Sequence, residues 1–322
     1  MFLAHTKVED SPSLAAAVIG ACRLKGGWVS EFQPFFLELI FKELLGVELD
    51  FNKLEGIDVS VAVKIFTESQ QRLELIELLV LVEMMVNPVP PDLESSIENW
   101  ANVLGVEDRS LLLARDVALQ CRAQAQSDFY RLFWMGEEDL QSSKFPDLLK
   151  KHGPQAWTFT VEPDEFLSRR WNSLSLSPKG SIGEAVWNHY QSNGFIIPGE
   201  LGGANAALAH HDWLHVLGDY KVDLVGEVEN AAFGAASSSM PGSTLWFLGV
   251  MAMYEGGLFD SVVTGGQRNC ISAPGIPKRI VNALKRGRQC NIDLLSIDYF
   301  SVAERQLKDL QREWQISSKE KC

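Results

Sequence analysis

The sequence predicts an all-α protein, and three features of the chain lead to this prediction. Apolar residues recur at intervals of three and four along most of the chain, which places them on one face of a helix. Strict two-residue alternation, which marks half-buried strands, is rare. Clusters of proline, glycine and serine separate the helical segments. With 46% hydrophobic and 22% charged residues, the composition is globular and excludes a disordered or collagen-like chain.

The first half of the chain shows four helical segments, at residues 35–45, 61–66, 73–86 and 95–104. Glu74, Glu77 and Glu83 interrupt an otherwise apolar third segment, which we interpret as a mostly buried helix. The proline-rich run 87–91 must end this segment, because proline lacks a backbone N–H and clashes with the preceding turn. We expect Asp92 to cap the next helix.

The length and the proline pattern predict two helical domains. A chain of 322 residues is long enough for about two domains. Helical periodicity gives way to proline, glycine and serine between about residues 144 and 176. We therefore predict a helical domain over residues 1–150, a linker over 151–175 and a second helical domain over 176–322.

The net charge, the cysteines and the apolar runs of the sequence exclude several kinds of partner and of site. The net charge of −13 excludes nucleic acid as a partner, because phosphate contacts need clustered Lys and Arg. No CxxC pair exists, so a cysteine zinc site and a thioredoxin-type redox motif are not expected, and the odd number of cysteines argues against a disulfide framework. The longest apolar run, residues 245–254, is far shorter than the roughly 20 residues that span a bilayer, and no signal peptide is visible. We expect a cytoplasmic chain. The five cysteines lie singly, as Cys22, Cys121, Cys270, Cys290 and Cys322.

Residues 73–118 resemble the TerB-like helical domains associated with tellurite resistance. The resemblance lies in two helices, the turn between them and the Leu104-Gly105-Val106 sequence that follows. The acidic Asp-Gly turn of that family is replaced here by Asn87-Pro88, so a metal or ligand role of this turn is not expected. We expect this half to be a helical bundle without a site of its own.

Three of the six histidines cluster at residues 210–215, and they carry the most informative pattern. On a helix, His211 and His215 lie one turn apart and share a face. Asp212 falls in the same sector, because successive helical residues are rotated by about 100°. His210 is one residue off this face and is expected to be a surface neighbour. His189 is a further candidate near the site.

A helical hairpin should bring a carboxylate to these histidines. Gly218-Asp219 interrupts the first helix, and Asp223 is a good N-cap for a second. Glu227 falls within the apolar stripe of the second helix, and Glu229 falls outside it. A carboxylate in an apolar stripe is costly to bury unless it is paired or bound to a cation. Two imidazoles and one carboxylate, with a position left for water or substrate, form a known catalytic metal site. We therefore predict a divalent cation there, zinc or iron.

The same residues match a known signature. His211-Asp212-x-x-His215, eleven residues and then Glu227 match the HDxxH-x11-E signature of the COQ-four family of ubiquinone (coenzyme Q) biosynthesis proteins. Residues 176–183 resemble the family's entry to a helix, and 283–288 and 307–312 resemble its closing helices. The resemblance covers about residues 174–317. The first half is not part of the family's usual pattern and is expected to be a fused domain.

The resemblance implies a fold and an activity. Members of the family are helical and peripheral on membranes, and they act on the head group of a polyprenylated benzoic-acid-type quinone precursor. The implied reaction is a metal-dependent oxidative decarboxylation that replaces the ring carboxylate with a hydroxyl, with dioxygen as oxidant. By the same resemblance, His211, Asp212, His215 and Glu227 form the catalytic metal site. Whether Asp212 is a ligand or orients a histidine stays open.

Partners and location follow from this resemblance. The expected partners are a prenylated quinone precursor or another isoprenoid lipid, a peripheral membrane surface at its inner face, other quinone-biosynthesis proteins and a second copy of the chain. An apolar channel beside the site, lined by 245–254 and the helix around 187–190, would hold the tail. The basic segment 278–288 is amphipathic and is expected to touch anionic lipid or to form a solvated face.

Two other classes of function remain open. The first is a non-catalytic protein that binds or organises prenyl lipids around a structural metal. The second is a metallohydrolase, because HDxxH resembles the HExxH motif of zinc peptidases. The aspartate side chain is one methylene shorter than glutamate, which pulls a general base away from a metal-bound water and counts against a peptidase.

Overall fold

The prediction of an all-α fold is confirmed. The computed structural model describes residues 2–132, 145–240, 242–260 and 267–319. Within these residues the regular structure is helical, and β structure is limited to isolated bridges such as that between Phe159 and Ala204.

The helices fall into two groups along the chain, and the candidate metal ligands lie on helices of the second group. The first half forms η1 (Val8–Asp10), α1 (Ser11–Cys22), α2 (Phe32–Ile40), η2 (Phe41–Leu45), α3 (Val59–Ile65), α4 (Ser69–Met84), α5 (Pro91–Leu104), α6 (Arg109–Ala118) and α7 (Arg122–Leu132). The second half forms α9 (Phe145–His152), η3 (Gly153–Trp157), α10 (Glu165–Asn172), η4 (Ser173–Leu176), α11 (Ile182–Asn193), α12 (Ala206–Gly218), α13 (Leu224–Ser237), α14 (Ser243–Met251), η5 (Ala252–Gly256), α15 (Ile276–Gln289), η6 (Tyr299–Val302) and α16 (Leu307–Glu313).

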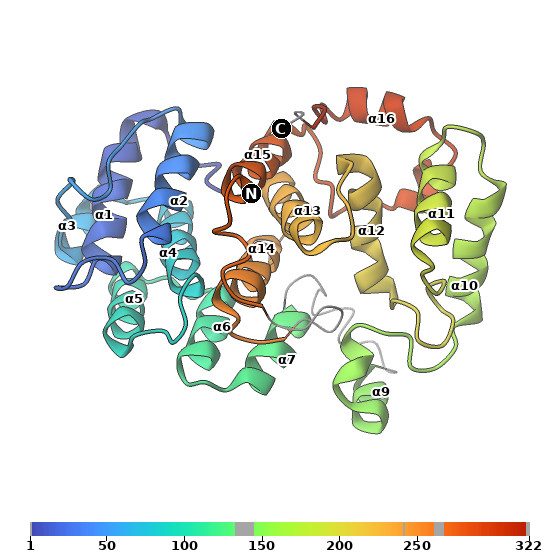
Figure 1. The fold of residues 1–322 in the computed structure, drawn as a ribbon, viewed down its shortest axis with the longest axis horizontal. Helices are drawn as coiled ribbons and strands as arrows, with labels where there is room; N and C mark the ends of the chain where they lie inside the picture. The colour runs from blue at the N-terminus through green and yellow to red at the C-terminus, as the bar shows by residue number, and fades with distance from the viewer. Residues whose placement is uncertain (1, 133–144, 241, 261–266, 320–322) are drawn as a thin grey trace.

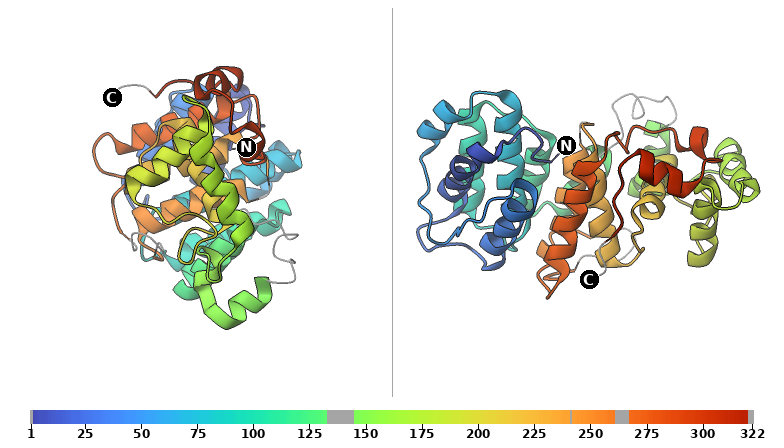
Figure 2. Two further views of the ribbon diagram at one scale, coloured as in Figure 1. Left: turned by 90° about the vertical axis from the view of Figure 1, so that its right-hand side faces the viewer. Right: turned by 90° about the horizontal axis from the view of Figure 1, so that it is seen from above.

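Helices α13, α14 and α15 lie in the middle of an elongated molecule. Figure 1 and the view from above in Figure 2 place α1–α5 at one end and α10 and α11 at the other. Helix α14 packs against α4, α6 and α7, and α15 packs against α2. Buried apolar residues of both halves form one continuous core cluster. The segment predicted as a linker, 151–175, contains η3, α10 and η4.

The proline-rich run ends one helix and begins the next, with one correction. Helix α4 ends at Met84, as predicted. Helix α5 begins at Pro91 rather than after Asp92, and Pro90 is its N-cap. The physical reason is that proline suits the first helical position, where its missing N–H has no partner to lose. Asp92 then lies in the first turn, where a carboxylate interacts favourably with the helix dipole.

Helix α4 is buried along most of its length, including its glutamates. Leu75 to Met84 are all buried, as are Glu74, Glu77 and Glu83. Glu74 accepts hydrogen bonds from the backbone N–H of His5 (2.7 Å) and the hydroxyl of Thr6 (2.8 Å). Glu83 is only 1% exposed, and its Oε1 has no hydrogen-bond partner. Burial raises the pKa of Glu83 to about 8, with a smaller contribution from Glu94.

The raised pKa of Glu83 predicts a specific pH dependence of stability. Above the ordinary glutamate pKa of 4.5 the unfolded chain loses this proton, whereas the folded chain keeps it up to about pH 8. Through Glu83 alone, the free energy of unfolding therefore falls by up to about 1.4 kcal/mol per pH unit across this window. Glu83→Gln should remove this dependence, so the variant should gain stability over the parent chain between pH 5 and pH 8.

The measurement is denaturant unfolding of both chains at several pH values. Glu304→Gln, at an exposed position, is the matched control and should show no such pH-dependent gain. A stability difference between Glu83→Gln and the parent chain that stays constant from pH 5 to pH 8 would contradict the assignment.

The described helices and cysteines bear on two expectations, the absence of a membrane-spanning helix and the absence of a disulfide framework. No helix among the described residues combines the length and the apolar character needed to cross a membrane. Cys22, Cys121, Cys270 and Cys290 are free thiols, and Cys22 and Cys290 are buried. Cys322 lies outside the described residues.

Candidate metal site

The predicted helical hairpin is present, with the predicted boundaries. Helix α12 begins after Asn205, whose side chain accepts a hydrogen bond from the Leu208 N–H (2.8 Å). It ends at Gly218, where Asp219 adopts a left-handed conformation with φ of 58°. Asp223 then caps α13 by accepting a hydrogen bond from the Gly226 N–H (2.9 Å). The turn sets α13 against α12.

The hairpin brings two histidines and one glutamate together. His211, His215 and Glu227 each offer one ligand atom, and these three atoms lie within 4.8 Å of one another. The Nε2 atom of His215 is 3.4 Å from one carboxylate oxygen of Glu227, and Nε2 of His211 is 3.6 Å from the other. Ligands at roughly 2.0–2.2 Å from a shared cation are separated by similar distances. The prediction that these three side chains share one interior face is confirmed.

Backbone carbonyls fix the orientation of both imidazoles. Nδ1 of His215 donates to the carbonyl of Tyr220 (3.2 Å), and Nδ1 of His211 donates to the carbonyl of Leu208. With the proton on Nδ1, the lone pair of each ring is on Nε2, which faces Glu227. Nε2 of His215 is buried and has no hydrogen-bond partner, as expected of an atom that can serve as a metal ligand. The donor set therefore fits a divalent cation.

Glu227 is the most exposed of the three side chains. The side chain of His215 is fully buried, that of His211 is 12% exposed and that of Glu227 is 26% exposed. Three protein ligands would leave a coordination position for water or substrate.

The charges of the site compensate one another without a cation. Burial alone would lower the pKa of His211, but the carboxylates of Asp212 and Glu227 outweigh it and raise this pKa to about 9. Burial alone would raise the pKa of Glu227, but the imidazoles of His215 and His211 hold it well below its usual range. A bound cation would take the place of the proton on His211.

Asp212 lies beside the three residues but is held by another partner. Its Oδ2 accepts a hydrogen bond from the hydroxyl of Tyr190 on α11, and its Oδ1 is 3.4 Å from Nε2 of His211. Asp212 is 5% exposed and does not belong to the group whose ligand atoms converge. Asp212 therefore lies where its carboxylate can orient the ring of His211 and favour the protonated form of that ring.

Aromatic side chains flank the site from two helices. The ring of His189 on α11 stacks on that of His215 at 5.8 Å between centroids, with 23° between the planes. Trp246 on α14 meets the ring of His211 edge to face at 6.1 Å. Helices α11 and α14 therefore stand beside the site, as expected of 187–190 and 245–254. The predicted channel between them stays a prediction.

Two neighbours of the site differ from expectation. His210, expected at the surface, is half-buried and packs against the ring of Tyr299 at 5.1 Å, because η6 covers that side of α12. Glu229, which falls outside the apolar stripe, is nevertheless 1% exposed. It is paired with the guanidinium of Arg279 (2.8 Å) and the ammonium of Lys319 (2.9 Å), two partners that are far away in the sequence.

Several basic side chains of residues 278–288 make contacts within the protein, while Lys278 is exposed, so the expected lipid-facing or solvated surface stays a prediction. Arg286 is 5% exposed and donates to the carbonyls of Gly218 and Ser317. Lys285 pairs with Glu43 (3.0 Å), and Arg288 donates to the carbonyl of Leu44 (3.1 Å). These cations, like Arg279, serve contacts within the protein, because α15 packs between α13 and α2.

Removal of the Tyr190 hydroxyl should weaken metal binding without abolishing it. In Tyr190→Phe the carboxylate of Asp212 loses its donor and is no longer held beside His211. Substitution of such an outer partner typically lowers metal affinity by about 10–100-fold. Isothermal titration with Zn²⁺ should show this loss at an unchanged stoichiometry.

Tyr299→Phe is the matched control for this prediction. It removes a buried hydroxyl that donates to the carbonyl of Leu294 (2.7 Å), but not to a residue of the site. Its affinity for Zn²⁺ should equal that of the parent chain. Equal affinities for all three chains would show that Asp212 does not support the site.

Comparison with known proteins gives a match among solved structures, but none among protein families or curated proteins. No protein-family model matches the chain, and no curated protein matches it. Among solved structures, a match is found to the crystal structure named "putative ubiquinone biosynthesis protein" from Nostoc punctiforme. This match has 14% sequence identity and a TM-score of 0.34, and it covers 75% of this chain and 97% of that one.

Proposed function

We propose that His211, His215 and Glu227 bind one divalent cation and that the protein acts on a prenylated quinone precursor. The observation that carries the first part is the convergence of two oriented Nε2 atoms on one carboxylate. The second part rests on the HDxxH-x11-E signature, which resembles that of the COQ-four family. The proposed reaction is the oxidative decarboxylation of a polyprenyl benzoate-type head group.

The chain's own residues would hold and orient such a substrate. A divalent cation supplies a positive centre that attracts the ring carboxylate and stabilises negative charge on the ring as carbon dioxide leaves. Two histidines and one carboxylate are the ligand set of non-haem iron oxygenases and also of zinc enzymes, so iron and zinc are both compatible. The rings of His189 and Trp246 would confine an aromatic head group entering from the Glu227 side.

A substrate with an isoprenoid tail resides in a bilayer, so the proposal includes contact with a membrane surface. Since Lys285 and Arg288 have partners within the protein, an apolar surface is a second candidate for this contact. Exposed apolar side chains occur on α10 and the loop after α11, at Phe166 (74% exposed), Ile196 (49%) and Leu201 (65%). Phe195 in the same loop contacts the ring of His189 at 5.8 Å, which connects this surface to the site.

Turnover of a labelled substrate tests the proposed reaction. The full chain, loaded with Fe²⁺ or Zn²⁺, is incubated under ¹⁸O₂ with a prenylated hydroxybenzoate that carries ¹³C in its carboxylate. Ascorbate is added as a two-electron reductant, because one oxygen atom of O₂ enters the ring hydroxyl and the other is reduced to water. We expect release of ¹³CO₂ and one ¹⁸O atom in the new ring hydroxyl, and neither product with His215→Ala. Release of no ¹³CO₂ by either metal form would contradict the proposed reaction.

A non-catalytic role is the second candidate, and the burial of His215 favours it. A ligand with a fully buried side chain suits a structural cation that ties α12 to α13. In that case the protein would bind the metal and copurify with an isoprenoid lipid, without turnover. A metallohydrolase is disfavoured, because the carboxylate of Asp212 accepts the Tyr190 hydroxyl hydrogen bond and lies beside an imidazole.

A further inference from the structure

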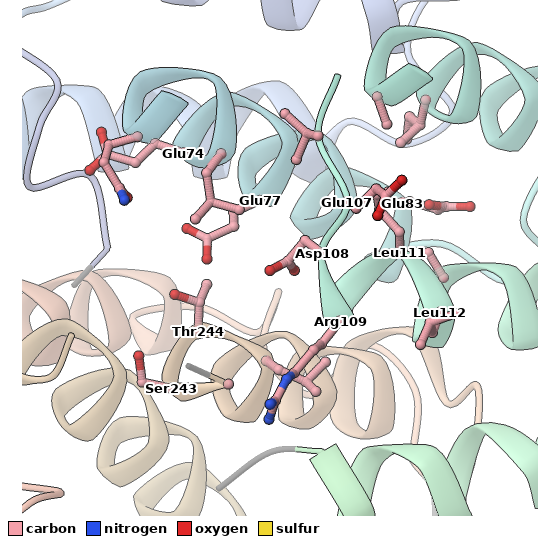
Figure 3. Close-up of a pocket in the computed structure, with 18 of the residues that line it drawn as sticks. Glu74, Glu77, Glu83, Glu107, Asp108, Arg109, Leu111, Leu112, Ser243 and Thr244 are labelled. Atoms are coloured by element: carbon pink, nitrogen blue, oxygen red, sulfur yellow. The ribbon is translucent and has the colours of Figure 1, made fainter. Parts of the chain in front are cut away.

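A cavity lies where the first half of the chain meets the start of α14, and none of the three candidate metal ligands lines it. It has a volume of about 970 Å³ and lies between α4, the α5–α6 region and the start of α14 (Figure 3). Seven carboxylates line it, against two arginines. We call it the acidic cavity. Its size falls at the upper end of the usual range for ligand pockets, about 300–1,000 Å³.

Carboxylates reach into the acidic cavity from different helices. Figure 3 shows the side chains of Glu77 on α4, Asp108 before α6 and Thr244 on α14 pointing toward one another. Glu77 is only 8% exposed. The two arginines of the lining are engaged elsewhere: Arg115 pairs with Glu98 at 2.5 Å, and Arg109 donates to the carbonyl of Leu132.

Glu83 gives an independent sign that this cavity suits a cation. It lines the cavity, is 1% exposed, and its Oε1 has no hydrogen-bond partner. A buried carboxyl group without a partner is unfavourable in either protonation state, and native proteins normally satisfy such groups. Burial raises the pKa of Glu77 and Glu83 to about 8, so the protein itself supplies too little positive charge there.

The spacing of the carboxylates indicates which cation fits. A metal ion needs ligand atoms that converge, and among the described residues only His211, His215 and Glu227 were found to meet that condition. In the acidic cavity the carboxylates are spread over several helices and alternate with apolar side chains such as Leu73, Ile97 and Leu245. This lining matches a flexible molecule in which ammonium groups are separated by methylene segments.

We propose that the acidic cavity binds a linear aliphatic polyamine. Its ammonium groups pair with Glu77, Glu83 and Asp108, and its methylene segments contact the apolar side chains between them. The first half of the chain, expected to be a helical bundle without a site of its own, thereby carries a binding site. This site does not depend on the metal site or on its proposed reaction.

Titration calorimetry with spermidine on the full chain tests the proposal. We expect one saturable site, and at least a tenfold weaker affinity in the double variant Glu77→Gln/Glu83→Gln at the same ionic strength. Both substitutions neutralise buried carboxylates without changing their shape, so the variant should fold, which circular dichroism checks. If it does not fold, Asp108→Asn takes its place with the same expected loss. Glu304→Gln, exposed and distant in sequence, is the matched control and should bind as the parent chain does.

Three results would overturn the proposal. The first is equal weakening in Glu304→Gln and the double variant, which would show general attraction of a polycation to a chain of net charge −13. The second is binding of Mg²⁺ at the same site as tightly as spermidine. The third is binding of an oligolysine peptide, sensitive to Glu77→Gln/Glu83→Gln, without any binding of spermidine, which would assign the cavity to a protein partner.

Discussion

Replacing His215 with alanine is expected to weaken divalent-cation binding strongly. The parent site holds three converging ligand atoms, and the variant holds only two. Loss of a direct ligand should exceed the effect of losing an outer partner, so the affinity for Zn²⁺ or Fe²⁺ should fall by more than about 100-fold. The measurement is metal titration, with metal content after dialysis as a second readout.

The control for this prediction lies on the same helix. His210→Gln changes a neighbouring histidine whose ring packs on Tyr299 rather than on the site. Its metal affinity should be that of the parent chain. If His215→Ala and His210→Gln bound metal as the parent chain does, the cation would have to lie elsewhere.

A single methyl group added between α13 and α15 is expected to have a large effect on stability. A Cβ atom at Gly287 would lie 2.3 Å from the carbonyl oxygen of Phe233, and backbone atoms cannot yield as the end of a flexible side chain can. Gly287→Ala should therefore lower the free energy of unfolding by about 3 kcal/mol, the upper part of the range for overpacked positions. Because α13 carries Glu227, the metal site should loosen as the two helices separate.

Gly26→Ala is the matched control, because a Cβ atom there meets nothing within 4 Å. Its stability in denaturant unfolding should differ little from that of the parent chain. Equal unfolding midpoints for Gly287→Ala and Gly26→Ala would mean that α13 and α15 are not packed as closely as described.

Local sequence signals predicted the hairpin that carries the site. The caps Asp223 and Asp219, the pair His211 and His215, and Glu227 in an apolar stripe all depend on neighbours within about one to three helical turns. Such patterns are legible because helical period and capping are local properties.

Features that depend on distant contacts could not be read from the sequence. Glu229 is buried only because Arg279 and Lys319 reach it from the end of the chain. The amphipathic pattern of residues 278–288 is visible in the sequence, but which of its basic side chains find partners within the protein depends on the placement of the neighbouring helices. The stacking of His189 on His215 joins two helices whose register the sequence does not reveal. The acidic cavity likewise arises from α4 meeting α14.

Anomalous X-ray scattering from crystals soaked in Zn²⁺ tests the metal site most directly. One anomalous peak is expected at roughly 2.0–2.2 Å from Nε2 of His211, Nε2 of His215 and a carboxylate oxygen of Glu227. Crystals of His215→Ala should lack it. A peak that avoids these three residues, or a parent crystal without a peak at this position under saturating Zn²⁺, would contradict the metal site on which the proposed function rests.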